Sequence, residues 1–349
     1  MNFDLTEDRQ MLADSLRRYL NDKYPIEHRN KVAYEAPFHD DAKWAELTEL
    51  GALYALAPEA AGGMGGAGFD IAVVFEELGR ALCPEPVLGA LMASRILTAA
   101  GADQEALLSG ATKYAVGLGE LDAPYDLSEM STVAKGGKLS GRKSVVYGGQ
   151  AADVLLIAAR DGDSLSVYAV QAADASITGY GMMDGAGAAE VVLEETPGEL
   201  VLANADAAIA DAVNAGIVGL CSEAVGAMEV LHKMTVEYLG QRKQFGRTIG
   251  TFQALQHRAV DMLTEIVQSR SIVIKAASEL GGPDAARYCS MAKNLIGRAG
   301  RLVAEEAIQM HGGIAMTWEY PGSHYAKRII MIDAQLGDTD YHLMQVAAA

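Results

Sequence analysis

Two short segments in the last third of the chain combine residue types that could hold an anionic ligand. The first covers residues 241–253 and places Arg242, Lys243 and Arg247 around the dipeptide Phe245-Gly246. An arginine suits a diphosphate, because its planar guanidinium donates two parallel hydrogen bonds to anionic oxygens. Basic residues at a helix end are also favoured by the helix dipole and usually face water. The first segment alone therefore leaves a ligand site and a solvated helix end open.

The second segment covers residues 309–316, where Gln309 ends a helical pattern and Gly312-Gly313 follow. Paired glycines let a backbone approach a ligand closely, because no Cβ stands in the way. The same glycines are typical of a helix stop, with His311 as a buried or capping histidine. This segment alone also leaves both interpretations open.

Composition excludes several other classes of function. The chain has 46 acidic and 28 basic residues and a net charge of −18, which argues against nucleic acid as a partner. Cys83, Cys221 and Cys289 are far apart in apolar surroundings, so we expect buried thiols rather than a disulfide or a metal site. With no apolar run of membrane-spanning length and no leader pattern, we expect a soluble, cytoplasmic protein without a membrane partner.

The elements that must position these segments form three regions. Apolar residues at helical spacing predict an N-terminal α-helical domain over residues 1–112. Short β-prone runs, with turn signals at Gly136-Gly137 and Asp161-Gly162, predict a small antiparallel β domain over residues 113–202. Long alanine-rich helices with short links predict a helical bundle over residues 203–349.

A glycine-rich stretch at residues 63–68 formally satisfies the dinucleotide pattern G-x-G-x-x-G. That pattern binds a dinucleotide only when a buried strand leads into its first glycine. Here a proline and a helical region precede it, so we expect a flexible connector.

Together, the two C-terminal segments resemble the paired signatures of the acyl-CoA dehydrogenase family of flavoproteins. The order of helical domain, β domain and helical bundle is similar to that family over essentially the whole chain. The resemblance implies an α+β multidomain fold with a C-terminal four-helix bundle. It also implies FAD as cofactor, an acyl-CoA thioester as substrate and an electron acceptor such as electron-transfer flavoprotein.

In this family the two segments cross a dimer interface and hold the adenosine diphosphate half of the neighbour's FAD. The resemblance places Arg242 at the FAD pyrophosphate. The full set of cofactor-binding residues that it implies comprises Arg242, Phe245, Gln253, Gln309, Gly313 and Thr339.

The chain departs from the family where a catalytic base should stand. The implied reaction removes a proton beside a thioester carbonyl while a hydride passes to the flavin, so it needs a carboxylate base. The family's two base positions correspond to Gly337 and to a position near Gly216, and both are glycine. Asp338 is the nearest replacement, although such residues more often cap a helix or face solvent. The catalytic residue is otherwise unknown.

The β domain departs as well. The family's flavin-shielding tryptophan and nearby threonine fall near Val145 and Tyr147, and residues 117–124 replace a Thr-Glu-Pro loop that seats flavin and substrate. The half offered to a neighbour is retained. This asymmetry resembles the small subunits of heterotetrameric acyl-CoA dehydrogenases, such as the pimeloyl-CoA enzyme and actinobacterial steroid side-chain enzymes.

Three hypotheses follow from the sequence. The first is a dehydrogenase component that lends FAD-binding residues to a larger catalytic subunit. The second is a homo-oligomeric acyl-CoA dehydrogenase that uses Asp338 as its base. The third is a cofactor-free scaffold that has kept the fold. The acyl group stays open among fatty, dicarboxylic and steroid-derived groups.

Overall fold

The computed structural model describes residues 5–348. The chain divides into two compact units, which are described separately. The helical unit comprises Met1–Ile26, Ala72–Cys83 and Ile217–Ala349, and the sheet unit comprises Glu27–Ile71 and Pro84–Gly216. The domain boundaries at residues 112 and 202 stay a prediction.

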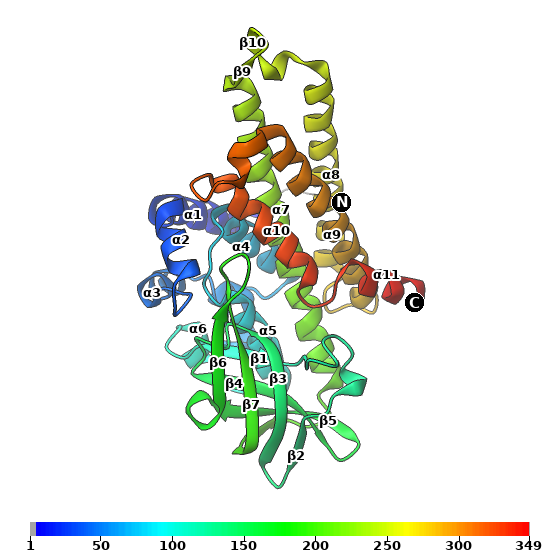
Figure 1. Ribbon diagram of the computed structural model, residues 1–349. Coiled ribbons are helices and arrows are strands. Elements are labelled where there is room, and N and C mark those ends of the chain that lie inside the picture. The colour runs from blue at the N-terminus through cyan, green and yellow to red at the C-terminus, as the bar shows by residue number, and fades with distance from the viewer. Residues whose placement is uncertain (1–4, 349) are drawn as a thin grey trace. The chain divides into compact units, whose positions relative to one another are not determined.

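The helical unit is built mainly from long helices with short connections (Figure 1). Helix α9 packs against α8, α10 and α11. Thr6 caps the first helix by accepting a hydrogen bond from the Arg9 amide, as its position before two acidic residues predicts. The elements of this unit are α1 (Glu7–Lys23), most of α4 (Gly68–Ala81) and of α7 (Asp206–Gln241), β9 (Lys243–Gln244), β10 (Arg247–Thr248), η5 (Ile249–Thr251), α8 (Gln253–Glu279), α9 (Ala285–His311), η6 (Gly312–Met316), α10 (Pro321–Ala334) and α11 (Thr339–Ala348).

Within residues 5–348, one helix, α7, is long and apolar enough to cross a membrane. However, 78% of its most apolar 18-residue window is buried in the protein. Glycines let α4 approach it closely. A Cβ at Gly79 would lie 2.0 Å from the Glu223 carbonyl oxygen, and one at Gly226 would lie 2.2 Å from that of Glu76. The apolar composition of α7 therefore reflects its place in a helical core.

Charged side chains tie the surrounding helices to α7. Arg270 of α8 pairs with Glu76 of α4 and with Glu229 of α7, and Arg80 pairs with the same two carboxylates. Burial opposes ionisation of Glu76, but the hydrogen bonds and positive charges of Arg270 and Arg80 outweigh it and lower the pKa of this carboxyl. This network keeps its charge at neutral pH.

A second ion pair lies deeper in the helical unit. The Arg328 guanidinium of α10 donates from Nε and Nη2 to both carboxylate oxygens of Glu223, at 2.6 and 2.7 Å. Its Nη1 donates to Gln335 Oε1 at 2.9 Å. Both charged side chains are buried, so each charge depends on the other.

The sheet unit combines a sheet with short helices. Its 3-10 helices are η1 (Tyr54–Leu56), η2 (Glu59–Ala61), η3 (Leu127–Glu129) and η4 (Ala172–Asp174). Its helices are α2 (Ile26–Tyr34), α3 (Asp41–Glu49), α5 (Val87–Ala100) and α6 (Glu105–Leu108), and its strands are β1 (Tyr114–Gly117), β2 (Val133–Lys135), β3 (Lys138–Tyr147), β4 (Val154–Asp161), β5 (Ser164–Gln171), β6 (Ser176–Gly181), β7 (Gly187–Pro197) and β8 (Glu199–Leu202).

The strands form one sheet in the order β6-β7-β3-β2-β4-β5-β8, with β1 beside β4. Most pairings are antiparallel, as predicted, but β1 and β2 pair with β4 in parallel. Gly136-Gly137 and Gly162 take positive φ angles in the turns that the sequence indicated. Strands β6 and β8 were not predicted, because their residues are largely exposed and lack a buried apolar alternation.

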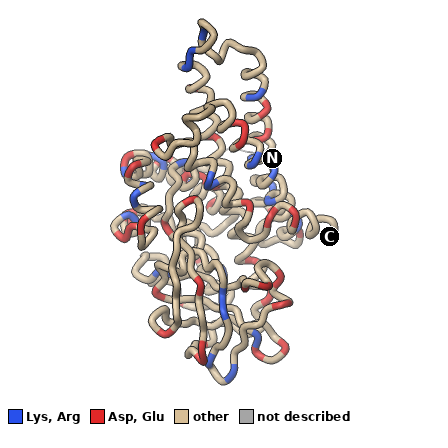
Figure 2. Tube along the Cα trace, viewed as in Figure 1, with Lys and Arg blue, Asp and Glu red and all other residues tan. Residues whose placement is uncertain are grey.

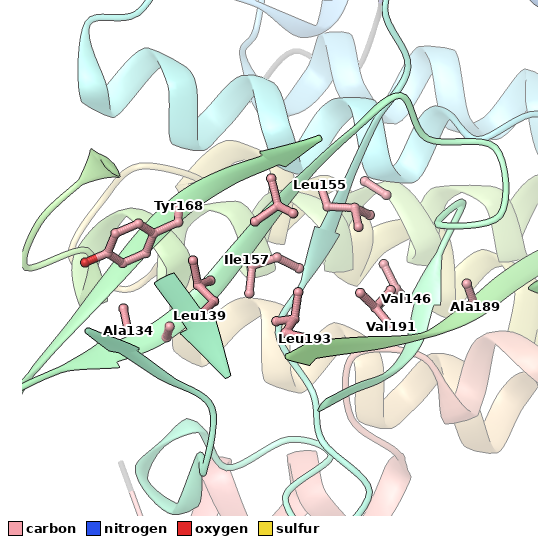
Figure 3. Packing of buried hydrophobic residues seen from close by; sticks show 12 residues of the cluster. Ala134, Leu139, Val146, Leu155, Ile157, Tyr168, Ala189, Val191 and Leu193 are labelled. Atoms are coloured by element: carbon pink, nitrogen blue, oxygen red, sulfur yellow. The ribbon is translucent and has the colours of Figure 1, made fainter. Parts of the chain in front are cut away.

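The core of the sheet unit lies on one side of β3, β4, β5 and β7 (Figure 3). Leu155 and Ile157 of β4 meet Leu139 and Val146 of β3 and Val191 of β7 in this cluster. Helix α5 packs against β1. Burial of these apolar side chains is the main stabilising contribution to the unit.

The glycine-rich stretch 63–68 connects η2 to α4. Within residues 5–348 no strand precedes β1, so no strand leads into these glycines. The prediction of a connector rather than a dinucleotide fingerprint is confirmed.

We expect Glu223→Ala to lower the free energy of unfolding by about 3–5 kcal/mol, because it removes the carboxylate that faces the buried Arg328 guanidinium. Chemical denaturation would measure the change. Replacing both partners, as Glu223→Leu with Arg328→Met, should restore most of the loss. A double variant no more stable than Glu223→Ala would contradict the assignment of the loss to the broken ion pair.

Candidate cofactor-binding site

A two-residue hairpin joins α7 to the start of α8 (Figure 1). Strands β9 and β10 pair around Phe245 and Gly246, whose φ angles are +53° and +76°. Two consecutive left-handed residues define a type I′ turn, and a left-handed conformation costs a residue with a Cβ about 1–2 kcal/mol. The strained residue carries its ring outward, since Phe245 is 89% exposed. Strain and an exposed aromatic ring at one position indicate a surface that meets another molecule.

The hairpin carries the positive charge that the sequence indicated (Figure 2). Residues 242–248 include three basic side chains and no acidic one. The Arg247 guanidinium stacks over the Phe252 ring at 4.0 Å, and Phe245 meets the same ring edge-on at 6.1 Å. Arg242 is exposed, and within residues 5–348 its guanidinium makes no hydrogen bond or ion pair. Its charge is therefore available to an anion.

Backbone hydrogen bonds fix the place of Arg242 at the end of α7. Its amide donates to the Tyr238 carbonyl at 2.8 Å, and its carbonyl accepts from the Ile249 amide at 2.9 Å. Gln253 opens α8 just beyond this turn, and its side chain is exposed. The structure thus presents Arg242, Phe245 and Gln253 on one connection between two helices.

The second segment lies at the end of α9. Gln309 is exposed in the last turn, and Gly312 ends the helix with a φ of +69°. A Cβ added at Gly312 or Gly313 would meet no atom within 4 Å, so the backbone is open there. The helix-stop interpretation is correct for Gly312, and the exposed backbone also leaves room for a ligand.

Three rings bring the two segments together. The His311 ring of α9 lies 4.6 Å from the Tyr238 ring of α7 and 4.8 Å from the Tyr320 ring, which precedes α10. His311 is buried and bonded through both ring nitrogens, to the Ala307 carbonyl and to the Tyr320 hydroxyl. The ends of α7 and α9 are therefore neighbours. Tyr238 and Tyr320 lie outside residues 241–253 and 309–316, so the sequence did not mark them as partners of His311.

The loop at the first base position is closed. Gly337 is buried with a φ of +102°, and a Cβ there would lie 2.5 Å from His342 Nε2 and 2.6 Å from Tyr341 Cδ1. The buried Lys293 ammonium of α9 donates to the carbonyls of Asp333 at 2.8 Å and Gly337 at 2.6 Å. A side chain at position 337 would adopt a strained φ angle and would require the His342 and Tyr341 rings to move.

The two residues beside Gly337 already have partners. Asp338 Oδ1 accepts from the Tyr341 amide at 2.8 Å, which makes Asp338 the N-cap of α11. The Thr339 hydroxyl donates to Asp333 Oδ1 at 2.8 Å. A Cβ at Gly297 of α9 would lie 2.0 Å from Thr339 Oγ1, so this glycine makes room for the loop. Thr339 is thus held in the helical unit's own loop, unlike the other residues predicted to bind the cofactor.

The second base position, Gly216, is a buried residue of α7. It belongs to the sheet unit, whereas Gly337 belongs to the helical unit. Neither position carries a carboxylate.

The segment of β3 around Val145 is bonded to other residues of the sheet unit. Val145 sits at a bulge of β3 with a φ of +52°. Its amide donates to Glu190 Oε1 at 3.2 Å, and Tyr180 donates to the same oxygen. Burial and the Glu190 charge raise the pKa of Tyr180 to about 12, so its hydroxyl keeps its proton. The Val145 amide is therefore bonded to a carboxylate of the same unit, although Val145 is 39% exposed, and Tyr147 ends β3.

The loop at residues 117–124 is also fixed internally. Glu120 accepts from the amides and hydroxyls of Ser131 and Thr132 and from the Lys143 ammonium at 2.9 Å. Burial opposes ionisation of Glu120, but these hydrogen bonds lower its pKa to about 2. The Glu120 carboxylate therefore holds the loop against β3, and both of its oxygens already accept hydrogen bonds.

Cys221 and Cys289 are buried, as expected, whereas Cys83 is partly exposed, and none of the three forms a disulfide within the described residues. Burial raises the pKa of Cys221 to about 12. Within the described part of the chain, no group of His, Cys, Asp and Glu side chains could hold a metal ion.

Two protein-family models match the chain. The one described as "Acyl-CoA dehydrogenase, N-terminal domain" covers residues 6–106, and "Acyl-CoA dehydrogenase, C-terminal domain" covers residues 207–349. Acyl-CoA dehydrogenase IpdE2 of Mycobacterium tuberculosis is 34% identical over 329 residues, which span 92% of this chain and 91% of that protein.

Solved structures share the fold over nearly the whole chain. A variant of the Tcur3481-Tcur3483 steroid ACAD has a TM-score of 0.89 and 27% identity, and the match covers 98% of this chain and 97% of that one. The ChsE4-ChsE5 complex from Mycobacterium tuberculosis has a TM-score of 0.91 at 23% identity, over 100% and 98% of the two chains, and shows the fold alone. The predicted order of helical domain, β domain and helical domain is confirmed.

For Asp338, we expect the capping role to govern stability. Asp338→Ala should lower the free energy of unfolding by about 1 kcal/mol, whereas Asp338→Asn should leave it nearly unchanged, because asparagine caps as well as aspartate. Chemical denaturation of the two variants would measure this difference. Equal losses in both variants would show that the charge, and not the cap, matters at this position.

Proposed function

Because the chain belongs to the acyl-CoA dehydrogenase family, we propose that it takes part in FAD-dependent α,β-dehydrogenation of an acyl-CoA thioester as the small subunit of a heteromeric enzyme. In this reaction the carbon beside the thioester carbonyl loses a proton and the next carbon loses a hydride. FAD supplies the hydride acceptor when it is bound. This chain holds part of the cofactor, and a larger subunit of the same family supplies the base.

The observation that carries this proposal is that the exposed, unpaired guanidinium of Arg242 ends α7, whose last turn meets the end of α9, where the backbone at Gly312 and Gly313 is open. A diphosphate needs a planar donor and close backbone approach, and this end of the helical unit offers both. The residues therefore fit the adenosine diphosphate half of FAD. Arg242 would bind the pyrophosphate, with Phe245, Gln253, Gln309 and Gly313 around it.

The residues do not fit the other half of the cofactor. The Val145 amide at the β3 bulge is bonded to Glu190, and the loop at Gly337 has no room for a carboxylate side chain. We therefore derive no proton or hydride transfer from this chain's own residues. The isoalloxazine ring and the proton acceptor belong to the partner subunit in this proposal.

The outer face of α8 supports association with another subunit. Val260, Leu263 and Val267 are 59%, 46% and 56% exposed at a spacing of three and four residues. Exposed residues 260–271 of this helix include only one charged side chain, Asp261, in a protein with a net charge of −18. An exposed apolar stripe of this kind is typical of a surface that packs against another helix.

The relatives support the choice of partner and substrate class. The steroid ACAD that shares 27% identity is named for two components, Tcur3481 and Tcur3483. We extend to this chain a heteromeric assembly, a steroid-derived or fatty acyl-CoA and an electron acceptor such as electron-transfer flavoprotein. A cytoplasmic location completes the proposal.

A homo-oligomer with Asp338 as base is the second candidate. The N-cap bond from Tyr341 counts against it, because it leaves only one carboxylate oxygen to reach a substrate. Asp338→Asn should abolish dehydrogenase activity under this alternative and leave it unchanged under the main proposal. The third candidate, a cofactor-free scaffold, leaves the unpaired Arg242 without a function.

Purification tests the main proposal directly. The chain expressed alone should carry little flavin and no dehydrogenase activity, and co-expression with a longer relative that retains a glutamate at a base position should yield a yellow, active complex. Arg242→Ala should weaken FAD binding by the complex about tenfold or more, as expected for loss of a charge-assisted hydrogen bond. Absorbance titration of the flavin-depleted complex would measure it.

Arg18→Ala is the matched control, because it removes the same charge from an exposed arginine of α1. It should leave FAD affinity unchanged. A yellow, active homo-oligomer from the single gene, or equal FAD affinity in Arg242→Ala and the parent complex, would contradict the proposal.

Subunit association tests the α8 surface. We expect Leu263→Arg to prevent co-purification with the larger subunit, because it places a charge in the centre of the apolar stripe, without unfolding the chain. Met11→Arg on α1, where the methionine is 64% exposed, should leave the complex intact. Light scattering of the purified complexes gives the readout, and an intact heteromer with Leu263→Arg would exclude α8 from the interface.

A further inference from the structure

The buried side chain of His311, next to Gly312, makes hydrogen bonds through both ring nitrogens, and these bonds are not needed to end helix α9. His311 Nδ1 lies 2.7 Å from the Ala307 carbonyl, and Nε2 meets the Tyr320 hydroxyl. A carbonyl only accepts, so Nδ1 carries the proton and Nε2 accepts from the tyrosine. Burial disfavours the charged ring more than the Ala307 and Met234 carbonyls favour it, which lowers the pKa of His311. The ring is neutral, with one tautomer selected by its partners.

The partner rings are themselves fixed. The Tyr320 ring is confined by α10, where a Cβ at Gly322 would lie 2.7 Å from Tyr320 Cε1. Burial, with the nearby Tyr238 and Glu237, raises the pKa of Tyr320 to about 12, so its hydroxyl remains a donor. The Tyr238 ring lies 4.6 Å from the His311 ring at a tilt of 35°, and the Tyr238 carbonyl accepts from the Arg242 amide at 2.8 Å.

These contacts form a continuous path between the two segments. It runs from Arg242 through Tyr238 to the His311 ring, and His311 is directly bonded to Gly312 in the chain. Arg242 and Gly312 are both exposed, and the Arg242 carbonyl also accepts from the Ile249 amide. The ring contact between Tyr238 and His311 joins the last turn of α7 to the last turn of α9, and so contributes to the separation of Arg242 and Gly312.

We propose that His311 is a positioning residue for the flavin-lending end of this subunit, acting through Tyr238 and Tyr320 to hold Arg242 and Gly312-Gly313 at the spacing that a diphosphate requires. The inference rests on the proposed function. His311 itself touches no cofactor; it sets the geometry of residues that do. Preorganisation of this kind contributes to affinity, because the ligand need not order the site when it binds.

The test uses the heteromeric complex after removal of flavin and measures two quantities, the affinity for FAD and the thermal unfolding midpoint. His311→Leu removes both hydrogen bonds but keeps a buried side chain, and should weaken FAD binding at least tenfold. His311→Gln keeps an acceptor for the Tyr320 hydroxyl and should recover most of that affinity. Tyr320→Phe removes only the hydroxyl, and should weaken binding several-fold if His311→Leu cannot be purified.

Glu223→Ala is the structural control, because it destabilises the helical unit through its ion pair with Arg328 and touches neither signature segment. It should lower the unfolding midpoint and change FAD affinity less than twofold. If the histidine and tyrosine variants behave like Glu223→Ala, with a lower unfolding midpoint and less than a twofold change in FAD affinity, His311 is a structural residue and the inference is wrong.

Arg242→Ala, measured in parallel, tests the proposed function separately from the positioning role of His311. If Arg242→Ala weakens FAD binding and both Tyr320→Phe and His311→Leu do not, the positioning inference fails while the proposed function stands. If Arg242→Ala leaves FAD affinity unchanged, the proposed function fails at its central residue, and the positioning role fails with it.

Discussion

The guanidinium of Arg242 is the charge on which the candidate site depends. In an acidic chain, several less exposed cations are paired with carboxylates: Arg328 with Glu223, Arg270 with Glu76 and Glu229, and Lys143 with Glu120. Arg242 stays exposed and unpaired in the part of the chain that the structure describes. An exposed cation costs little in free energy and gains a strong hydrogen bond only when an anion arrives. The hairpin is thus ready for a ligand that this chain does not itself supply.

The loop around Gly337 imposes the complementary constraint. Lys293, fully buried, uses its ammonium group to hold two backbone carbonyls of this loop, and Gly337 adopts a conformation that leaves no space for a Cβ. A carboxylate residue at position 337 would therefore strain the backbone and displace the neighbouring His342 and Tyr341 rings.

Sequence periodicity predicted most of the fold for physical reasons that are local. The long helices α8 and α9 repeat apolar residues over many turns, and the glycine pair at residues 136–137 selects a tight hairpin. The parallel pairings of β1 and β2 with β4 were not predictable in this way, since they join strands far apart in the chain. Strand β6 lacks a buried apolar face, so it carried no signal.

The same distinction applies to the candidate site. Arg242 and Gln309 were found because their neighbours form recognisable segments, but nothing local marks Tyr238 or Tyr320 as partners of His311. Their role follows only from tertiary packing, in which the ends of α7 and α9 and the start of α10 meet. The side chains proposed to face the cofactor are thus encoded in short motifs, whereas the contact between those motifs depends on the rings of His311, Tyr238 and Tyr320. A substitution in the ring stack should therefore alter cofactor affinity without altering any residue that contacts the cofactor.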